Sequence, residues 1–192
     1  MMRDDDPARA AALLERIGRL LQSALHAGGM PPAQWHTLHY LANANRFSRT
    51  PTAIGQYLGA TKGTVSQTII ALVRKGLVAK RPDPTDRRSV SLRLTARGET
   101  VLARHPMAQV IAAMGALPTS TRRDLCAGLA ELLAVMLARQ GGRPFGQCAH
   151  CRYFQRDGAR GAPGGSHRCG LLDVPLSDED SAKICVEYEP AA

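Results

Sequence analysis

Four of the five cysteines lie within the last 45 residues, at Cys148, Cys151, Cys169 and Cys185. They form one close pair with two residues between its members, followed by two single cysteines after gaps of 17 and 15 residues. Four thiolates so close in sequence are enough for one tetrahedral zinc ion or one four-iron cluster. Zinc modules mostly use two close pairs and this segment has one, so the spacing leaves zinc and iron–sulfur as alternatives.

Two histidines and one further cysteine complete the set of soft metal-binding side chains. His150 and His167 lie within the cysteine-rich segment. Because four cysteines already fill a four-ligand site, we expect these imidazoles at the surface or supporting the ligands. Cys126 stands apart, between Leu125 and Leu129 in a helical pattern, and we expect it to be a buried, inert thiol.

Catalytic motifs are missing from the sequence. It contains no Ser/His/Asp set, no phosphate-binding glycine loop, no HExxH motif and no carboxylate pair at a useful spacing. We therefore predict that the protein is not an enzyme, and that an electron-transfer role for the cysteines is the weakest of the functional alternatives.

Positive charge is concentrated in the middle of the chain. The formal net charge is +9, and residues 61–104 hold ten lysines and arginines against three acids. From Cys148 to the end there are five basic and seven acidic residues. A concentrated basic segment favours a nucleic-acid partner, so we expect the middle segment, and not the cysteine-rich tail, to contact DNA.

The hydrophobic spacing indicates the elements that must position these residues. Apolar residues recur at helical spacing over residues 7–27, 31–45, 52–59, 61–75, 95–114 and 119–140. Residues 77–82 and 89–94 alternate apolar and polar residues like two short strands, with a basic turn between them. This order predicts a mainly α-helical protein with one small β-hairpin.

The two short central helices are separated by a glycine-containing turn, which is typical of a helix-turn-helix unit. Gly59 ends the first helix and Thr61 can cap the second. In the second helix, Val65, Ile69, Leu72 and Val73 share one face, so the small polar and cationic side chains point away from the core. Such a helix suits the major groove of duplex DNA, where base edges offer donors and acceptors.

The outer helices carry more apolar surface than a small domain can cover. Residues 8–27 and 98–139 contain repeated leucines at helical spacing, and a second subunit is the natural cover, so we expect a homodimer. Gly141 and Gly142 end the last helix. We therefore predict a DNA-binding and dimerisation domain over residues 1–141 and a small, irregular, metal-bound tail over residues 142–192.

Residues 51–102 resemble the MarR family of winged-helix regulators. The segment GTVSQTIIALVRKGLVAKR is similar to that family's recognition helix and first wing strand. Asp86-Arg87-Arg88 followed by Leu94-Thr95-Ala-Arg-Gly98 is similar to its wing signature, D-x-R leading into L-T-x-x-G. The resemblance implies a winged helix-turn-helix that binds double-stranded, pseudo-palindromic DNA as a dimer, with the repressor as the expected kind of regulator.

The resemblance also implies roles for single residues. Recognition-helix residues that would face the major groove are Lys62, Thr64, Ser66 and Gln67. Arg87 and Arg88 would reach the minor groove, where a narrow groove concentrates negative potential, and Asp86 would brace the arginine. A small aromatic or phenolic ligand, bound between the dimer and DNA-binding regions, is often the signal in this family.

The tail has a resemblance of its own. Its patterns CxxCxxF, CGLL and CVEY are similar to high-potential iron–sulfur proteins and to small cluster-bearing subunits of some glycyl-radical enzymes. That likeness favours a [4Fe–4S] cluster over zinc on Cys148, Cys151, Cys169 and Cys185. The leading hypothesis is therefore a repressor that responds to its metal or to redox state. The alternative is a ligand-responsive regulator with a purely structural zinc tail.

The chain shows no sign of a membrane or secretory segment. No stretch approaches the roughly 18 to 20 apolar residues that a membrane-spanning helix needs. The first residues, MMRDDDPAR, are acidic where a secretory signal would be basic and then apolar. We expect a cytoplasmic protein without membrane contact, whose cysteines are kept reduced.

Overall fold

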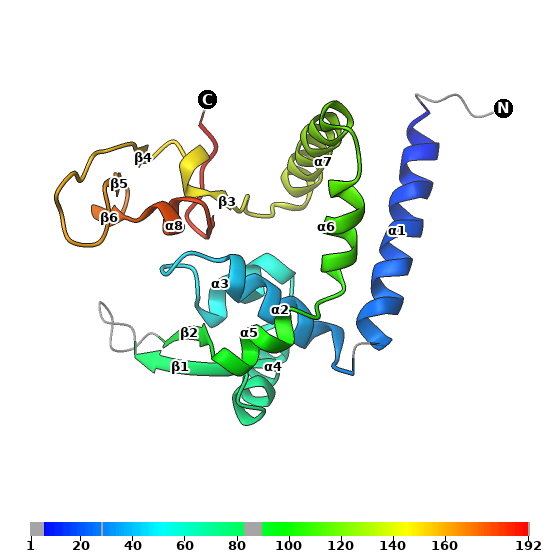
Figure 1. The fold of residues 1–192 in the computed structure, drawn as a ribbon, viewed down its shortest axis with the longest axis horizontal. Helices are drawn as coiled ribbons and strands as arrows, with labels where there is room; N and C mark the ends of the chain where they lie inside the picture. Colours follow the sequence, from blue (N-terminus) through cyan, green and yellow to red (C-terminus); the bar gives the residue numbers. More distant parts are fainter. Residues whose placement is uncertain (1–5, 28, 83–89, 192) are drawn as a thin grey trace.

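The computed structural model describes residues 6–27, 29–82 and 90–191. Up to residue 140, the elements are α1 (Pro7–Ala27), α2 (Pro32–Asn43), α3 (Pro51–Leu58), α4 (Lys62–Arg74), β1 (Val78–Pro82), β2 (Val90–Leu94), α5 (Ala96–Leu102), α6 (Met107–Gly115) and α7 (Thr119–Gln140). Figure 1 shows α2 to α5 and the hairpin gathered into one unit, which we call the head. The predicted mainly helical fold with a small hairpin is confirmed.

The core of the head forms where the apolar faces of its helices meet the hairpin. Leu38, Ile54, Leu72 and Leu92, from α2, α3, α4 and β2, are fully buried in one cluster. Strands β1 and β2 pair antiparallel, with Val78 opposite Leu94 and Pro82 opposite Val90. α2 lies at the centre and packs against α4, α5 and β2, so it fixes the recognition unit relative to the hairpin.

Local signals set the ends of the helix-turn-helix. The Thr50 side chain accepts a hydrogen bond from the Ala53 N–H and caps α3, and Gly59 ends that helix in the left-handed conformation. The Thr61 hydroxyl accepts from the Thr64 N–H and caps α4. Hydroxyl caps and left-handed glycines satisfy backbone groups that a helix end leaves open, so the turn predicted from the sequence forms as expected.

The L-T-x-x-G motif holds α5 against the segment before β1 through one close backbone contact. The Thr95 side chain accepts from the Gly98 N–H and donates to the Gly76 carbonyl. A Cβ atom on Gly98 would lie 2.1 Å from the Leu77 carbonyl oxygen, a distance that real side chains do not tolerate. Glycine is therefore required at position 98 for α5 to pack on the segment that leads into β1.

One predicted helix is wrong in its length. The sequence pattern predicted a single helix over residues 95–114, whereas the structure ends α5 at Leu102 and begins α6 at Met107. Pro106 stands between them, and a proline disfavours helical backbone in the residue before it and cannot donate an interior hydrogen bond. His105, just before the proline, is buried and packs edge-on against Trp35 of α2.

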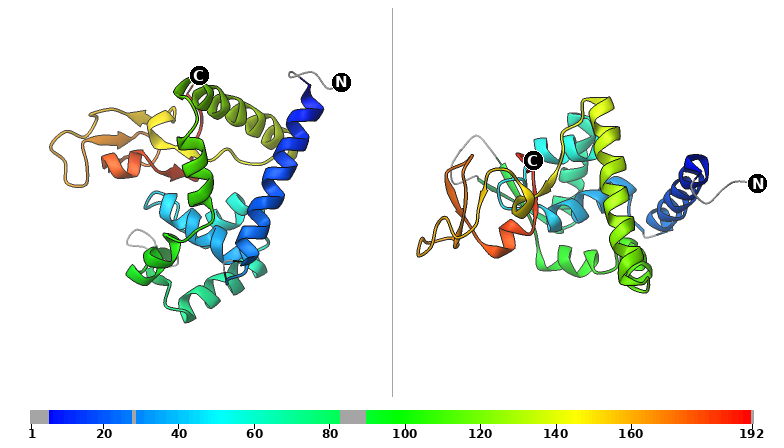
Figure 2. Two further views of the ribbon diagram at one scale, coloured as in Figure 1. Left: turned by 45° about the vertical axis from the view of Figure 1, so that its right-hand side comes forward. Right: turned by 90° about the horizontal axis from the view of Figure 1, so that it is seen from above.

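The outer helices lie away from the head. In Figures 1 and 2, α1 and α7 extend beyond it, and α6 and α7 have no buried residue within this chain. Their exposed apolar side chains, with those of α1, include Leu13, Ile17, Leu20, Ile111, Leu132, Leu133 and Met136. Cys126 of α7 is exposed in this chain. The expectation of a buried thiol is therefore wrong for the single chain, in which α7 has no buried residue.

The tail contains more regular structure than the sequence predicted. Its elements are β3 (Gly146–Gln147), η1 (Cys148–His150), β4 (Phe154–Gln155), β5 (His167–Cys169), β6 (Val174–Leu176), α8 (Asp178–Ser181) and β7 (Ile184–Cys185). β3 pairs with β7, and β4, β5 and β6 form a second small antiparallel sheet. The glycine-rich stretch between β4 and β5 contains turns only, as expected. In Figures 1 and 2 the tail and α1 lie on opposite sides of the head.

None of the helices in the described parts of the chain is long and apolar enough to cross a membrane.

Candidate nucleic-acid interface and cysteine tail

α4 presents one apolar and one polar face. Val65, Ile69 and Leu72 are buried against the head, as the spacing predicts. Val73, which the pattern also assigned to the inner face, is 36% exposed and lies at the edge of that face. The residues expected to face DNA are all exposed: Lys62, Thr64, Ser66 and Gln67.

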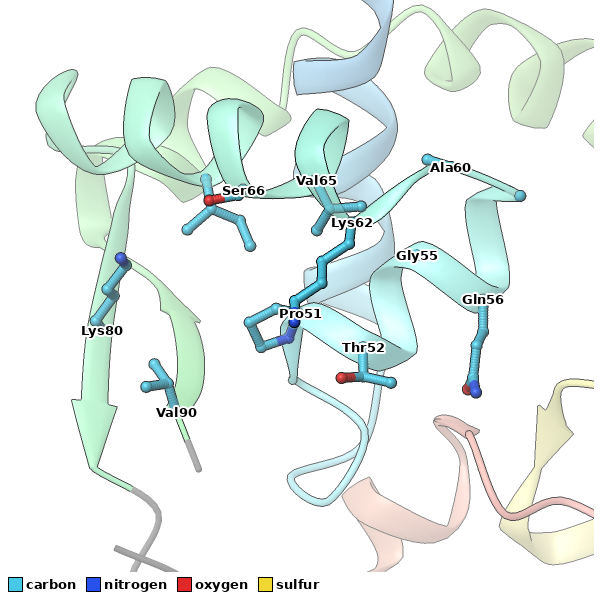
Figure 3. A pocket seen from close by; sticks show the side chains of 12 residues that line it. Pro51, Thr52, Gly55, Gln56, Ala60, Lys62, Val65, Ser66, Lys80 and Val90 are labelled. Atoms are coloured by element: carbon cyan, nitrogen blue, oxygen red, sulfur yellow. The ribbon is translucent and has the colours of Figure 1, made fainter. Parts of the chain in front are cut away.

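An open groove of about 660 Å³ runs between the helix-turn-helix and the hairpin. Figure 3 shows Lys62 and Ser66 of α4, Thr52 and Gln56 of α3, and Lys80 of β1 around it. Among the described residues, the charged side chains that line this groove are Lys62 and Lys80, and such cations attract phosphate.

Sequence reasoning missed the contributions of α3 and β1 to the groove. Thr52 and Gln56 received no role from the sequence, and Lys80 was counted only as part of the basic segment. In β1, Val78 is buried, Ala79 is half-buried and the residues from Lys80 to Pro82 are exposed, a gradient that the alternating pattern of the sequence did not predict. The wing-tip residues Asp86, Arg87 and Arg88 lie outside the described residues, so their roles remain predictions.

The tail brings three of its four cysteines into one small core. Cys148 and Cys185 are buried beside Leu176, and Cys169 packs against them. Cys151 follows Cys148 by one 3₁₀ turn, and its N–H donates to the Cys148 carbonyl at 2.9 Å. Within the described ranges, no three His, Cys, Asp or Glu side chains are arranged to hold a metal ion. The predicted four-cysteine site thus remains a prediction, with three of its members clustered.

Hydrogen bonds shift the pKa values of the two buried thiols in opposite directions. The hydrogen bond from Cys148 lowers the pKa of Cys185, against the opposing effect of burial, and further donors from Asn45, the Glu187 backbone and Ser48 act in the same direction. The same contact with Cys185, together with burial, raises the pKa of Cys148. Cys185 is therefore the better stabilised thiolate of the pair, and thiolate is the form that binds metals.

The two tail histidines differ in their surroundings. His167 is buried, its Nδ1 accepts from the Asp157 N–H at 3.1 Å, and its Nε2 lies 2.9 Å from the Asp178 carboxylate. Because Nδ1 accepts, the proton sits on Nε2 and points at Asp178. His150 is exposed. His167 therefore holds the tail's loops together.

A loop of the head receives the tail. This docking loop, residues 44–49, joins α2 to α3. The Asn45 N–H donates to the Ile184 carbonyl at 2.9 Å, and the Val186 N–H donates to the Ser48 hydroxyl at 2.8 Å. The Arg46 guanidinium pairs with Asp180. The tail, expected from the sequence to be a separate module, thus packs directly on the connection that leads into the helix-turn-helix.

A smaller cavity of about 260 Å³ lies between α1, α2, α3 and the α5–α6 junction. His36, His39, His105 and Tyr57 line it together with leucines of α1 and α3. Burial lowers the pKa of His105 to about 4, and its Nε2 is buried without a hydrogen-bond partner. A neutral imidazole with an unused polar atom can bind a small polar molecule.

Comparison with known proteins identifies the relatives of the head. Residues 28–89 match the family model described as MarR family. FabT from Streptococcus pneumoniae, solved in complex with DNA, is 24% identical, with a TM-score of 0.53, covering 68% of this chain and 97% of that one. A MarR transcriptional regulator from Methanosarcina mazei Go1 is 22% identical, with a TM-score of 0.52, covering 68% and 96%. A MepR mutant from a multidrug-resistant S. aureus clinical isolate is 21% identical, with a TM-score of 0.53, covering 70% and 99%.

At these identities the likeness shows the fold, which is the MarR winged helix. No curated protein matches the sequence.

Proposed function

We propose that this protein is a MarR-type transcription regulator, a repressor, that binds duplex DNA through α4 and the hairpin. The observation that carries the proposal is α4 itself, whose apolar face is buried and whose polar face lines a groove that has lysines as its charged side chains in the described part of the chain. The family match over residues 28–89 and the DNA bound in the FabT structure support it. Short polar side chains on an exposed helix are suited to read base edges in the major groove.

We propose further that the regulator is a homodimer held by α1, α6 and α7. These helices leave leucines such as Leu20 and Leu133 more than half exposed, and soluble monomers rarely expose large contiguous apolar patches. A twofold dimer presents two recognition helices, so the operator should be pseudo-palindromic, with half-sites about one helical turn apart.

The finer part of the proposal is that the tail's cysteines hold a [4Fe–4S] cluster, and that DNA affinity depends on it. Cys148, Cys169 and Cys185 supply three sulfurs in one core, and Cys151 is the fourth ligand. Buried donors near the sulfurs, Asn45 above all, suit bound thiolate because hydrogen bonds to sulfur tune such sites. A cluster would supply a one-electron redox change at this place.

A DNA-binding titration at several salt concentrations tests the first part. Neutralising phosphates releases counterions, so affinity for a palindromic duplex should fall steeply between roughly 50 and 200 mM salt. Lys62→Ala should weaken binding and reduce the salt slope by about one. Arg160→Ala is the matched control, since it removes an exposed tail cation that pairs with Asp157. A flat salt response for the wild type contradicts the proposal.

Absorption and metal analysis test the second part. A protein purified without air should be brown, with broad absorption near about 400 nm, if the cysteines hold a cluster. If the protein is colourless and contains one zinc ion per chain, the tail holds structural zinc and the cluster proposal is wrong.

The second candidate function rests on the cavity at His105. A small organic ligand there would lie between the outer helices and the head, and so could shift the two DNA-reading heads of a dimer, while the tail holds only structural zinc. If protein stripped of its tail metal binds DNA as tightly as loaded protein, this candidate is favoured over the metal-responsive one.

A further inference from the structure

We infer that Asn45 is a positioning residue that couples the cysteine tail to the helix-turn-helix, through α3, and to the hairpin, through β2. This inference deepens the proposed function and rests on it, because it names the route by which the tail regulates DNA binding. The route runs from the Cys148 sulfur through Asn45 to the docking loop, and from that loop to α3 and β2.

Asn45 connects the two sides with one fully buried side chain. Its Oδ1 accepts hydrogen bonds from the N–H groups of Phe47 and Ser48 at 3.2 and 3.0 Å. Its Nδ2 lies 3.2 Å from the Cys148 Sγ. Because an amide oxygen must face the two N–H donors, the amide has one possible orientation, in which Nδ2–H donates to the sulfur. The same side chain therefore stabilises the conformation of the docking loop and contacts the Cys148 sulfur.

Two further contacts hold the tail on this loop. The Ser48 hydroxyl accepts from the Val186 N–H, one residue after Cys185, and the Asn45 N–H donates to the Ile184 carbonyl, one residue before it. The docking loop thus binds the backbone on both sides of a second cysteine. A displacement of the Cys148 or the Cys185 sulfur would therefore change a contact of the docking loop.

The loop in turn contacts the helix-turn-helix at α3 and the hairpin at β2. Thr50, the next residue, caps α3 through its hydroxyl. The Arg49 carbonyl accepts from the Leu92 N–H of β2 at 2.8 Å. The Tyr40 hydroxyl donates to the Ser48 carbonyl at 2.8 Å and ties the loop to α2. Movement of the loop therefore shifts α3 and the hairpin together, and both of these elements line the groove beside α4.

The docked arrangement is the DNA-competent state of the head. Loss of the Cys148 acceptor leaves a buried amide N–H without a partner, which is unfavourable, so the loop opens and the walls of the groove lose their fixed spacing. The metal-bound and metal-free forms of the tail then stabilise the docked and the open state of the head unequally. DNA binding is regulated in that way.

Asn45→Asp in the full-length chain tests the route. Aspartate keeps the oxygen that accepts from Phe47 and Ser48 but removes the N–H donor to sulfur. Asn43→Asp is the matched control, because Asn43 is exposed and its Nδ2 donates only within α2. Ser48→Ala, a gentler change, removes the acceptor for Val186 and decides the question if the aspartate variant does not fold.

Two measurements are compared across these variants: hydrogen exchange of residues 90–94, and affinity for a palindromic duplex that the wild type selects from a random pool. Asn45→Asp and Ser48→Ala should weaken DNA binding about five-fold or more and speed exchange in β2, whereas Asn43→Asp changes neither. Cys148→Ala combined with Asn45→Asp should bind DNA no more weakly than Cys148→Ala alone, because Cys148→Ala already removes the acceptor of the Asn45 N–H together with a proposed metal ligand.

Faster exchange confined to the tail, with β2 and DNA affinity unchanged, overturns the inference. Full additivity of the Cys148 and Asn45 changes also overturns it. If the wild type selects no duplex, the proposed function fails, and exchange in β2 alone then decides whether the tail is coupled to the head.

Discussion

Gly98→Ala should destabilise the head more than any exposed glycine substitution. The new Cβ would lie 2.1 Å from the Leu77 carbonyl oxygen, whereas ordinary contacts begin near 3.4 Å, so α5 and the start of β1 must separate by about 1.3 Å. The carbonyl that must move also accepts the Thr95 N–H at 3.1 Å. The Thr95 hydroxyl bond to Gly76 joins the same two segments.

The magnitude follows from these contacts. Overpacking of a tight site costs about 1 to 3 kcal/mol, and each weakened hydrogen bond adds about 0.5 to 1.5 kcal/mol. Alanine in place of glycine returns up to about 1 kcal/mol through helix propensity. The net loss in the free energy of unfolding should therefore be about 2 to 4 kcal/mol, measured by urea denaturation followed by circular dichroism.

Gly63→Ala is the matched control for this experiment. Gly63 also lies within the first turn of a helix, but a Cβ there meets only the Thr61 hydroxyl, at 4.0 Å. That variant should be as stable as the wild type or more stable by up to about 1 kcal/mol. If Gly98→Ala unfolds at the same urea concentration as Gly63→Ala, the close approach of α5 to Leu77 does not exist in solution, and the account of the L-T-x-x-G motif is wrong.

Three further changes test the head, the dimer and the tail. Val65→Asp should unfold the helix-turn-helix, because it buries an unpaired charge, and loss of its cooperative thermal transition by circular dichroism checks this; a normal transition would contradict the buried position of Val65. Leu132→Glu should convert a dimer into monomers in sedimentation experiments, since it places a charge on the apolar surface of α7; an intact dimer would place the interface elsewhere. Cys169→Ser should abolish metal retention and make residues 143–192 sensitive to protease while the head stays folded, because metal binding and folding are linked in small sites; full metal content and a resistant tail would refute the four-cysteine site.

Contacts between the tail and the head indicate which part of the tail should become sensitive to protease. The sequence predicted a small, irregular tail that is bound to metal. In the structure, contacts with the head also stabilise the tail, since Phe145 packs edge-on against Tyr40 and Tyr57. Protease sensitivity after Cys169→Ser should therefore be greatest between β4 and β5, the glycine-rich stretch that lies in the chain between Phe145 and the docking contacts of Asp180, Ile184 and Val186.

The sequence by itself determined the elements of the head, because their signals lie within a few residues of one another. Apolar residues at helical spacing, hydroxyl caps at Thr50 and Thr61 and a glycine after α3 fix the helices locally. Where a local signal was overlooked, as at Pro106, the prediction was wrong by one helix break. The charge pattern also predicted that the head and not the tail contacts DNA, since the position of charges along the chain is read directly from the sequence.

Only the tertiary structure decided how the tail is placed. Asn45 and Cys148 are separated by 103 positions, and a contact at that distance has no periodic signal in a sequence. Asn45 reads locally as a residue that ends a helix, and only the approach of the tail gives its amide a sulfur to contact. Whether a short segment stands apart or docks depends on matched hydrogen-bond donors and acceptors across two surfaces. That complementarity exists only after both surfaces have folded.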